Sequence, residues 1–118
     1  MSRESNGNLH FYPYYEDLLK ERRKTSTLRL GDQTMKYRKG DLVKLTYSWN
    51  PQEAVMLGHV RIVDVFSVPI RSLKNEDLEG ESPDCKTTQA VPYVLSAIYR
   101  KVVTEDDIVT VIRWNYVD

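Results

Sequence analysis

The sequence predicts an α+β fold, a small β-barrel with two main flanking helices. Strand-like segments outnumber helical ones, and the predicted elements follow the order helix, three or four strands, helix, strand. The last strand must return over a long sequence distance to close the sheet. With 118 residues and 41% hydrophobic content, the chain is long enough for one domain with a core and too short for two.

The chain is expected to begin with a disordered N-terminal tail over residues 1–9. The first eight residues are polar, rich in Gly, Ser and Asn, and show no apolar periodicity. The remaining residues, 10–118, are expected to form the single domain.

The first helix is predicted to follow Pro13, which suits a first helical turn because the amide hydrogen that it lacks is not used there. Leu18 and Leu19 face inward at helical spacing, and the helix ends near Arg23. Four aromatic residues flank its start: Phe11, Tyr12, Tyr14 and Tyr15. They have two interpretations, packing in the core or stacking on nucleic-acid bases.

Three strands are predicted next, over Ser26 to Leu30, Leu42 to Tyr47 and Leu57 to Phe66. The first shows alternation of apolar and polar residues, which is typical of a half-buried strand, and the other two are apolar-rich runs bounded by turn residues. Turns that contain Gly and Asp separate the first two strands, and Pro69 bounds the third.

The second main helix is predicted to start near Pro92 and to run to about Arg100. Its apolar residues recur at i, i+3, i+4 and i+7: Val91, Val94, Leu95 and Ile98. Residues 79–88, before this helix, are predicted to form a loop. A β-branched run from Ile108 to Trp114 then predicts a central closing strand with both faces partly buried.

Several classes of site are excluded by the sequence. The single cysteine, Cys85, excludes internal disulfides, and with two histidines it cannot form a zinc site of Cys and His ligands. Cys85 is expected to be a loop thiol; a nucleophilic role needs a partner that neither His10 nor His59 supplies locally. His59 is an exposed strand residue or, alternatively, a general base. No P-loop, zincin or Cys-X-X-Cys motif is present, so we expect no metal and no cofactor.

Apolar runs are all short, so neither a transmembrane helix nor a signal peptide is expected. We therefore expect a soluble, cytoplasmic protein with no membrane partner, and favour a monomer. The 17 basic and 17 acidic residues cancel overall, but residues 1–44 carry 10 basic against 6 acidic residues and residues 45–118 carry 7 against 11. The basic segment either collects phosphate locally or mixes with the acidic segment in space, in which case the fields cancel.

Reactive side chains gather between the first helix and the first strand. Lys24 and Thr27 provide an amine and a hydroxyl, and Arg29 shares the strand parity of Thr27 and so points to the same face. A base, a nucleophile and an anion-binding group can therefore share one pocket. The alternative is a solvated helix C-terminus, where basic residues favour the helix dipole, followed by an ordinary Thr-rich strand.

These elements together resemble the ASCH domains, a branch of the PUA-like superfamily of small β-barrels associated with RNA. The resemblance covers nearly the whole chain from Phe11. It rests on five pieces, which are the helix Tyr15 to Arg23, the segment Arg23-Lys24-Thr25-Ser26-Thr27-Leu28-Arg29, the turn Gly40-Asp41, the helix ending Ala97-Ile98-Tyr99 and the strand to Trp114. The motif Arg-Lys-Thr-x-Thr-x-Arg most resembles that of the small bacterial amidohydrolases that remove the acyl group from N4-acetylcytidine.

The resemblance implies a catalytic site made of a Lys, a Thr and a carboxylate, of which the first two are Lys24 and Thr27. Counting back without gaps from Ile98-Tyr99 places the carboxylate on Asp84. Glu81 and Glu79 are close enough in sequence to take the role if the loop is shifted.

Two functions follow as expectations. In the first, Thr27 attacks the amide of an N4-acylated cytosine nucleoside with Lys24 as base, while Arg23, Arg29 and Glu81 contact the ligand. In the second, the same groups bind RNA without breaking a bond, as in a regulatory or ribonuclease-associated module. A structural or interaction domain with a vestigial pocket is a third interpretation.

Overall fold

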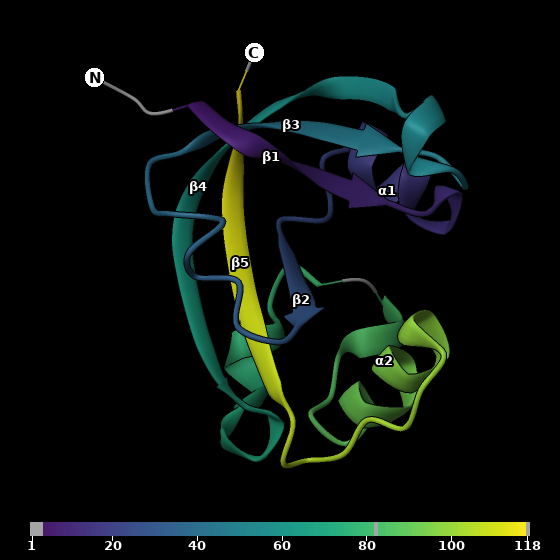
Figure 1. Ribbon diagram of the computed structural model, residues 1–118, viewed down its shortest axis with the longest axis vertical. Coiled ribbons are helices and arrows are strands. Elements are labelled where there is room, and N and C mark those ends of the chain that lie inside the picture. Colours follow the sequence, from purple (N-terminus) through teal and green to yellow (C-terminus); the bar gives the residue numbers. More distant parts are fainter. Residues whose placement is uncertain (1–3, 82, 118) are drawn as a thin grey trace.

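The computed structural model describes the backbone of residues 4–81 and 83–117, and the side chains within these ranges except those of residues 4–7 and of Asp84. Five strands form one curled sheet in the order β1-β3-β4-β5-β2 (Figure 1). They span Glu4–Phe11 (β1), Ser26–Leu30 (β2), Leu42–Tyr47 (β3), Val55–Pro69 (β4) and Ile108–Val117 (β5). The helices are Glu16–Lys20 (α1) and Val91–Tyr99 (α2). Short 3-10 helices span Pro13–Tyr15, Pro51–Glu53, Ile70–Ser72, Asn75–Leu78 and Pro83–Cys85. The predicted α+β class, a barrel-like sheet with two helices, is confirmed.

The first strand differs from the sequence-based expectation of a tail over residues 1–9. β1 pairs in parallel with β3, with Leu9 opposite Leu45 and Phe11 opposite Tyr47. Leu9 and Phe11 are buried in the core. The polar residues before Leu9 join the sheet through backbone hydrogen bonds, which do not depend on side-chain polarity. Residues 1–3 lie outside the part of the chain that the structure describes.

The core consists of two hydrophobic clusters that meet at β5. One is built around Trp114 and includes Phe11 and Leu19 from the N-terminal part of the chain. The other lies under α2 and joins Leu95 to Val111. Neighbouring residues of β5 enter different clusters, so the strand is buried on both faces, as predicted for a central closing strand.

The first helix is shorter than predicted and ends in a tight turn. Arg22 adopts a left-handed conformation with φ 58°, which stops the helix before the predicted end at Arg23. The amides of Arg23 and Lys24 both donate to the carbonyl oxygen of Leu18, at 2.9 and 3.3 Å. This turn redirects the chain into β2, which lies between α1 and α2 in Figure 1. It carries the side chain of Lys24 into the protein interior.

Candidate functional site

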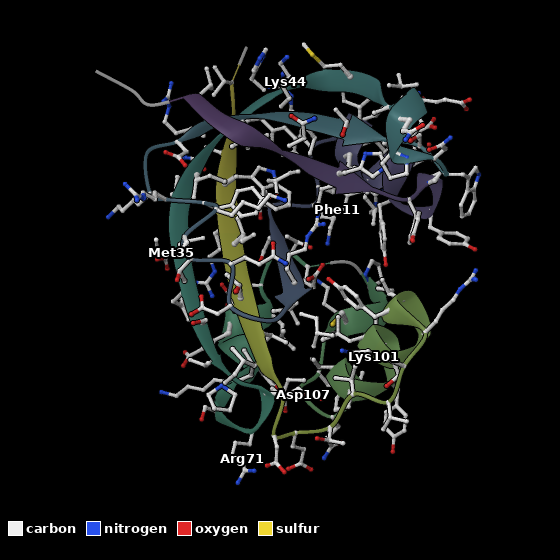
Figure 2. All side chains as sticks on the ribbon, viewed as in Figure 1. Phe11, Met35, Lys44, Arg71, Lys101 and Asp107 are labelled. Carbon is white, nitrogen blue, oxygen red and sulfur yellow. The ribbon has the colours of Figure 1, made fainter. Side chains whose placement is uncertain are left out.

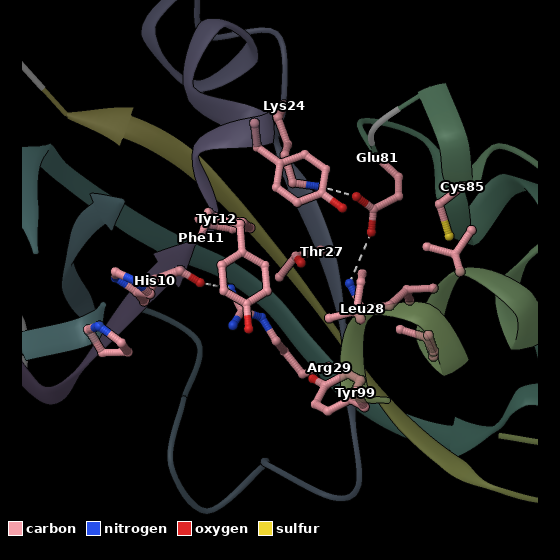
Figure 3. A pocket seen from close by; sticks show the side chains of 15 residues that line it. His10, Phe11, Tyr12, Lys24, Thr27, Leu28, Arg29, Glu81, Cys85 and Tyr99 are labelled. Carbon is pink, nitrogen blue, oxygen red and sulfur yellow. Dashed lines mark hydrogen bonds and ion pairs between the residues drawn. The ribbon is translucent and has the colours of Figure 1, made fainter. Parts of the chain in front are cut away.

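A pocket of about 240 Å³ opens between β2, the end of β1 and α2 (Figure 3). Its wall combines aromatic rings with a few polar groups, the composition typical of a small-ligand site. The lining residues are His10, Phe11, Tyr12, Tyr15, Lys24, Thr27, Leu28, Arg29, Pro51, Glu81, Cys85, Val94, Leu95, Ile98 and Tyr99.

Lys24 is the most deeply buried charged side chain of the pocket, at 2% exposure. Its Nζ forms an ion pair and hydrogen bond with Oε1 of Glu81. The same amine lies 5.2 Å from the ring centroid of Tyr15 and 5.5 Å from that of Phe11. The cation is therefore held between one carboxylate and two aromatic rings.

Burial lowers the pKa of Lys24 below its usual value, because the charged form loses its hydration. The carboxylate of Glu81 raises this pKa, and the nearby Arg29 guanidinium lowers it again. Desolvation is the larger influence, so the net direction is downward. A larger fraction of the Lys24 amine is therefore neutral near physiological pH than for a lysine at the surface.

Glu81 is positioned by direct attachment of its loop to β2. The carbonyl oxygen of Gly80 accepts hydrogen bonds from the amides of Thr25 and Ser26, at 2.9 and 3.2 Å. The second carboxylate oxygen of Glu81 accepts from the amide of Leu28 at 3.0 Å. Two anchors, the carbonyl oxygen of the preceding residue and the carboxylate itself, fix Glu81 against Lys24.

Thr27 and Arg29 occupy the same face of β2, as strand parity predicted. Thr27 is buried, at 5% exposure, and its side chain points into the pocket between Lys24 and Arg29 (Figure 3). The guanidinium carbon of Arg29 lies 4.7 Å from the ring centroid of Phe11, and Nη2 donates to the carbonyl oxygen of His10 at 2.9 Å. A hydroxyl and a fixed cation thus share the pocket with the Lys24 amine.

The predicted residues divide into two groups. Lys24, Thr27, Arg29 and Glu81 line one pocket. Arg23 does not line it, because it lies in the turn that ends the first helix with its side chain towards solvent. That side chain is 61% exposed and pairs with Glu21 at 2.5 Å.

The sequence prediction placed the carboxylate first on Asp84. The backbone of this residue lies in the 3-10 helix Pro83–Cys85, but its side chain lies outside the described residues. Glu79 is exposed and does not line the pocket. Among the side chains that the structure does describe, Glu81 is the carboxylate that pairs with Lys24.

Two pocket residues were not predicted from the sequence. His10 lies at the rim, with Nδ1 2.8 Å from Oγ1 of Thr46 and Nε2 3.2 Å from the carbonyl oxygen of Ser48. Tyr99, at the end of α2, accepts a hydrogen bond from the amide of Leu30 at 3.1 Å. Tyr99 is the last residue of an amphipathic helix that lines the pocket, and that position was the available signal for it.

The described side chains contain no group of three or more His, Cys, Asp and Glu residues that could hold a metal ion. Within the described part of the chain, no helix is long and apolar enough to cross a membrane.

Comparison with known proteins supports the fold. No protein-family model matches the chain, and no curated protein matches it in sequence. The ASCH domain from Lactobacillus crispatus JV V101 superposes with a TM-score of 0.63 at 12% identity, over 85% of this chain and 68% of that one. A protein from Enterococcus faecalis V583, of the family model DUF984, superposes with a TM-score of 0.62 at 14% identity, over 100% of this chain and 82% of that one. The chain therefore has the fold of an ASCH domain.

Proposed function

We propose that this ASCH-fold protein hydrolyses the amide of N4-acylated cytosine nucleosides, with Lys24, Thr27 and Glu81 as the catalytic residues. The observation that carries the proposal is the buried ion pair of Lys24 with Glu81, placed in a small pocket that Thr27 also lines. A buried amine with a lowered pKa, a hydroxyl and an orienting carboxylate are the parts that nucleophilic catalysis by threonine requires.

The first step is attack by Thr27. The neutral amine of Lys24 accepts the proton of the Thr27 hydroxyl as Oγ1 forms a bond to the carbonyl carbon of the acyl group. The amine must lose its own proton beforehand, and the burial that lowers the Lys24 pKa makes that loss easier. Glu81 holds the amine in place through Oε1, while Oε2 is anchored to β2.

In the second step, the cytosine amine leaves. The tetrahedral oxyanion forms near the Arg29 guanidinium, which provides a fixed positive charge in a partly buried position. When the oxyanion collapses, the bond between the carbonyl carbon and N4 breaks, and the Lys24 ammonium returns its proton to the leaving amine. Water then attacks the acyl ester on Thr27, again with Lys24 as base. The products are cytidine, the carboxylic acid and free Thr27.

The shape and size of the pocket support a planar, compact substrate. Rings of Phe11, Tyr12 and Tyr99 contribute to the wall, and flat apolar surfaces of this kind stack well on a pyrimidine. At about 240 Å³, the pocket is at the small end for ligand sites. It suits one base with its acyl group rather than a larger cofactor.

The test is release of acetate from N4-acetylcytidine by the purified protein. We expect Lys24→Ala to lower kcat/KM by about 10²- to 10⁴-fold, because the general base is lost. Thr27→Ala should abolish turnover, whereas Thr27→Ser keeps a hydroxyl and should retain measurable activity. Lys20→Ala is the matched lysine control, because Lys20 is half exposed and pairs with Glu16. Absence of turnover by the wild type would refute the proposal.

Ligand binding without hydrolysis is the second candidate, as in an RNA-binding module. It is favoured by the hydrogen bond that Lys24 donates to Glu81, since an amine in its protonated form binds an anion but accepts no proton. In that case Lys24→Arg, which preserves a cation, should keep salt-dependent binding of single-stranded RNA, and no variant should release acetate.

A further inference from the structure

Three large aromatic side chains stand exposed beside the pocket. Tyr12, Tyr14 and Trp49, here called the aromatic cluster, are 38%, 75% and 61% exposed. The rings of Tyr12 and Trp49 are stacked, with centroids 5.8 Å apart and an interplanar angle of 27°. The ring of Tyr14 meets Trp49 edge-on at 4.9 Å. The three rings therefore support one another and leave aromatic surface open to solvent.

The aromatic cluster is held by short rigid segments. Tyr14 lies in the 3-10 helix Pro13–Tyr15, and Tyr12 is its N-cap. Trp49 precedes the 3-10 helix Pro51–Glu53, whose start is capped by the side chain of Asn50 through a 3.0 Å hydrogen bond from the amide of Gln52. Two proline-initiated turns therefore restrict the backbone beneath the rings, so little ordering is needed when a ligand stacks on them.

The aromatic cluster lines a groove that shares four lining residues with the pocket. The groove measures about 890 Å³, and Tyr12, Tyr15, Val94 and Ile98 line both cavities. Among the described residues that line the groove, the one charged side chain is that of Arg100. A ligand that fills the pocket can therefore extend over flat rings towards a cation.

We propose that the protein acts on cytosine within a single-stranded polynucleotide, whose neighbouring base stacks on the aromatic cluster while a backbone phosphate approaches Arg100. This inference rests on the proposed function and specifies its substrate. Base–aromatic stacking tolerates any sequence because every base has a π-face, and each stacked base contributes about 1–3 kcal/mol to binding. The groove matches this chemistry, with rings for bases and a cation for phosphate.

The first experiment compares two substrates of the full-length protein, N4-acetylcytidine and a five-nucleotide RNA with N4-acetylcytidine flanked by two uridines on each side. We expect a lower KM for the oligonucleotide. Trp49→Ala should reduce the ratio of the two kcat/KM values, oligonucleotide over nucleoside, by about tenfold, which corresponds to about 1.4 kcal/mol of lost stacking. Trp49→Phe keeps a ring and should preserve most of the ratio.

Met35→Ala is the matched control. Met35 is a large apolar side chain with 81% exposure, and Figure 2 shows it well separated from Phe11 at the pocket. The substitution removes exposed apolar surface outside the aromatic cluster, so the ratio of the two kcat/KM values should not change.

The second experiment needs no turnover. Trp49 is exposed and Trp114 is buried, at 1% exposure, so an unmodified five-nucleotide RNA should quench the emission of Trp49 selectively. The quenching should weaken with salt and disappear in Trp49→Phe. If the nucleoside is hydrolysed while the oligonucleotide shows neither a lower KM nor quenching, the strand proposal is wrong and the proposed function stands.

RNA binding without hydrolysis would also distinguish the two proposals. Quenching by RNA without acetate release from either substrate would support strand binding and refute the amidohydrolase. A monomer–dimer equilibrium that Trp49→Ala abolishes, with no quenching by RNA, would show that a second copy of the chain covers the aromatic cluster and would overturn the strand proposal.

Discussion

At Lys24, burial and an ion-pair partner act in opposite directions on one amine. Burial lowers its pKa, and Glu81 raises it. A buried ion pair is a weak source of stability, because the loss of hydration offsets much of the mutual attraction. The net contribution of the pair to stability can be measured with a double-mutant cycle.

We expect Glu81→Gln alone to lower the free energy of unfolding by about 3 kcal/mol, because it leaves a buried amine without its carboxylate. Lys24→Met should also destabilise, since Glu81 then has no cation. The double variant removes both charges and should be more stable than Glu81→Gln, although inactive. Urea unfolding of the four proteins measures the cycle. A double variant whose loss equals the sum of the single losses would show that the pair contributes nothing by itself.

At the residue scale, the sequence predicted the strand side of the site better than the loop side. Thr27 and Arg29 follow from alternation along one strand, a local rule. The carboxylate depends on how the loop before α2 folds, and three short 3-10 helices between Ile70 and Cys85 determine that path. Counting residues from α2 cannot anticipate such turns, so it named Asp84 first, with Glu81 and Glu79 as alternatives. The structure places Glu81 beside Lys24, and the side chain of Asp84 lies outside the described residues.

At the element scale, Gly80 allows the loop to approach β2 closely. Its φ is +82°, and a Cβ there would lie 2.1 Å from Oγ1 of Thr25. A side chain at this position both strains the backbone and pushes the loop away from the strand. Because the next residue is Glu81, this displacement would reach the carboxylate that pairs with Lys24.

Gly80→Ala should therefore lower the free energy of unfolding by about 1–3 kcal/mol and reduce activity. Gly40→Ala is the matched control, with φ +91° and no atom within 4 Å of the added Cβ. It should cost only the conformational penalty of about 1 kcal/mol and leave activity intact. Thermal unfolding and acetate release measure both effects. Equal losses in the two variants would contradict a role for the close approach to Thr25.

Helices and strands could be predicted where their apolar residues recur with the period of that element. β2, β3 and α2 follow alternation or helical spacing, and their predicted ranges agree with the structure. β1 was missed because its first residues are polar and pair through the backbone. The first helix ends early because of the left-handed conformation of Arg22, which no apolar pattern records.

At the scale of the whole molecule, the lowered pKa of Lys24 couples stability to pH. The folded-state pKa of Lys24 lies below the ordinary lysine value of 10.5. Between these two values the unfolded chain binds more protons than the folded one, so the free energy of unfolding rises with pH. Tyr116 acts oppositely at higher pH: its pKa is raised above 10.0, so its contribution is lost as pH increases through the folded-state value.

We expect the wild type to gain stability relative to Lys24→Met as the pH rises towards 10.5. In that range the buried ammonium of Lys24 loses its proton, and Lys24→Met has no such group. If the proposed mechanism holds, activity should rise through the same folded-state pKa, since that mechanism needs the neutral amine as base. Urea unfolding at a series of pH values and a pH profile of kcat/KM provide the two readings. If the midpoint of the kcat/KM profile differed clearly from that of the stability profile, the catalytic base would be a group other than Lys24.

The outer edge of β2 shows a further property of the site. β2 ends the sheet, and the outward-facing amides of its alternate residues all have acceptors: Ser26 donates to Gly80, Leu28 to Glu81 and Leu30 to Tyr99. An open edge would present these groups to a strand of another molecule. The side chains that build the pocket thus also act against intermolecular β-pairing. We expect a variant that loses the Glu81 carboxylate to aggregate more readily than the wild type, because the Leu28 amide then has lost this acceptor.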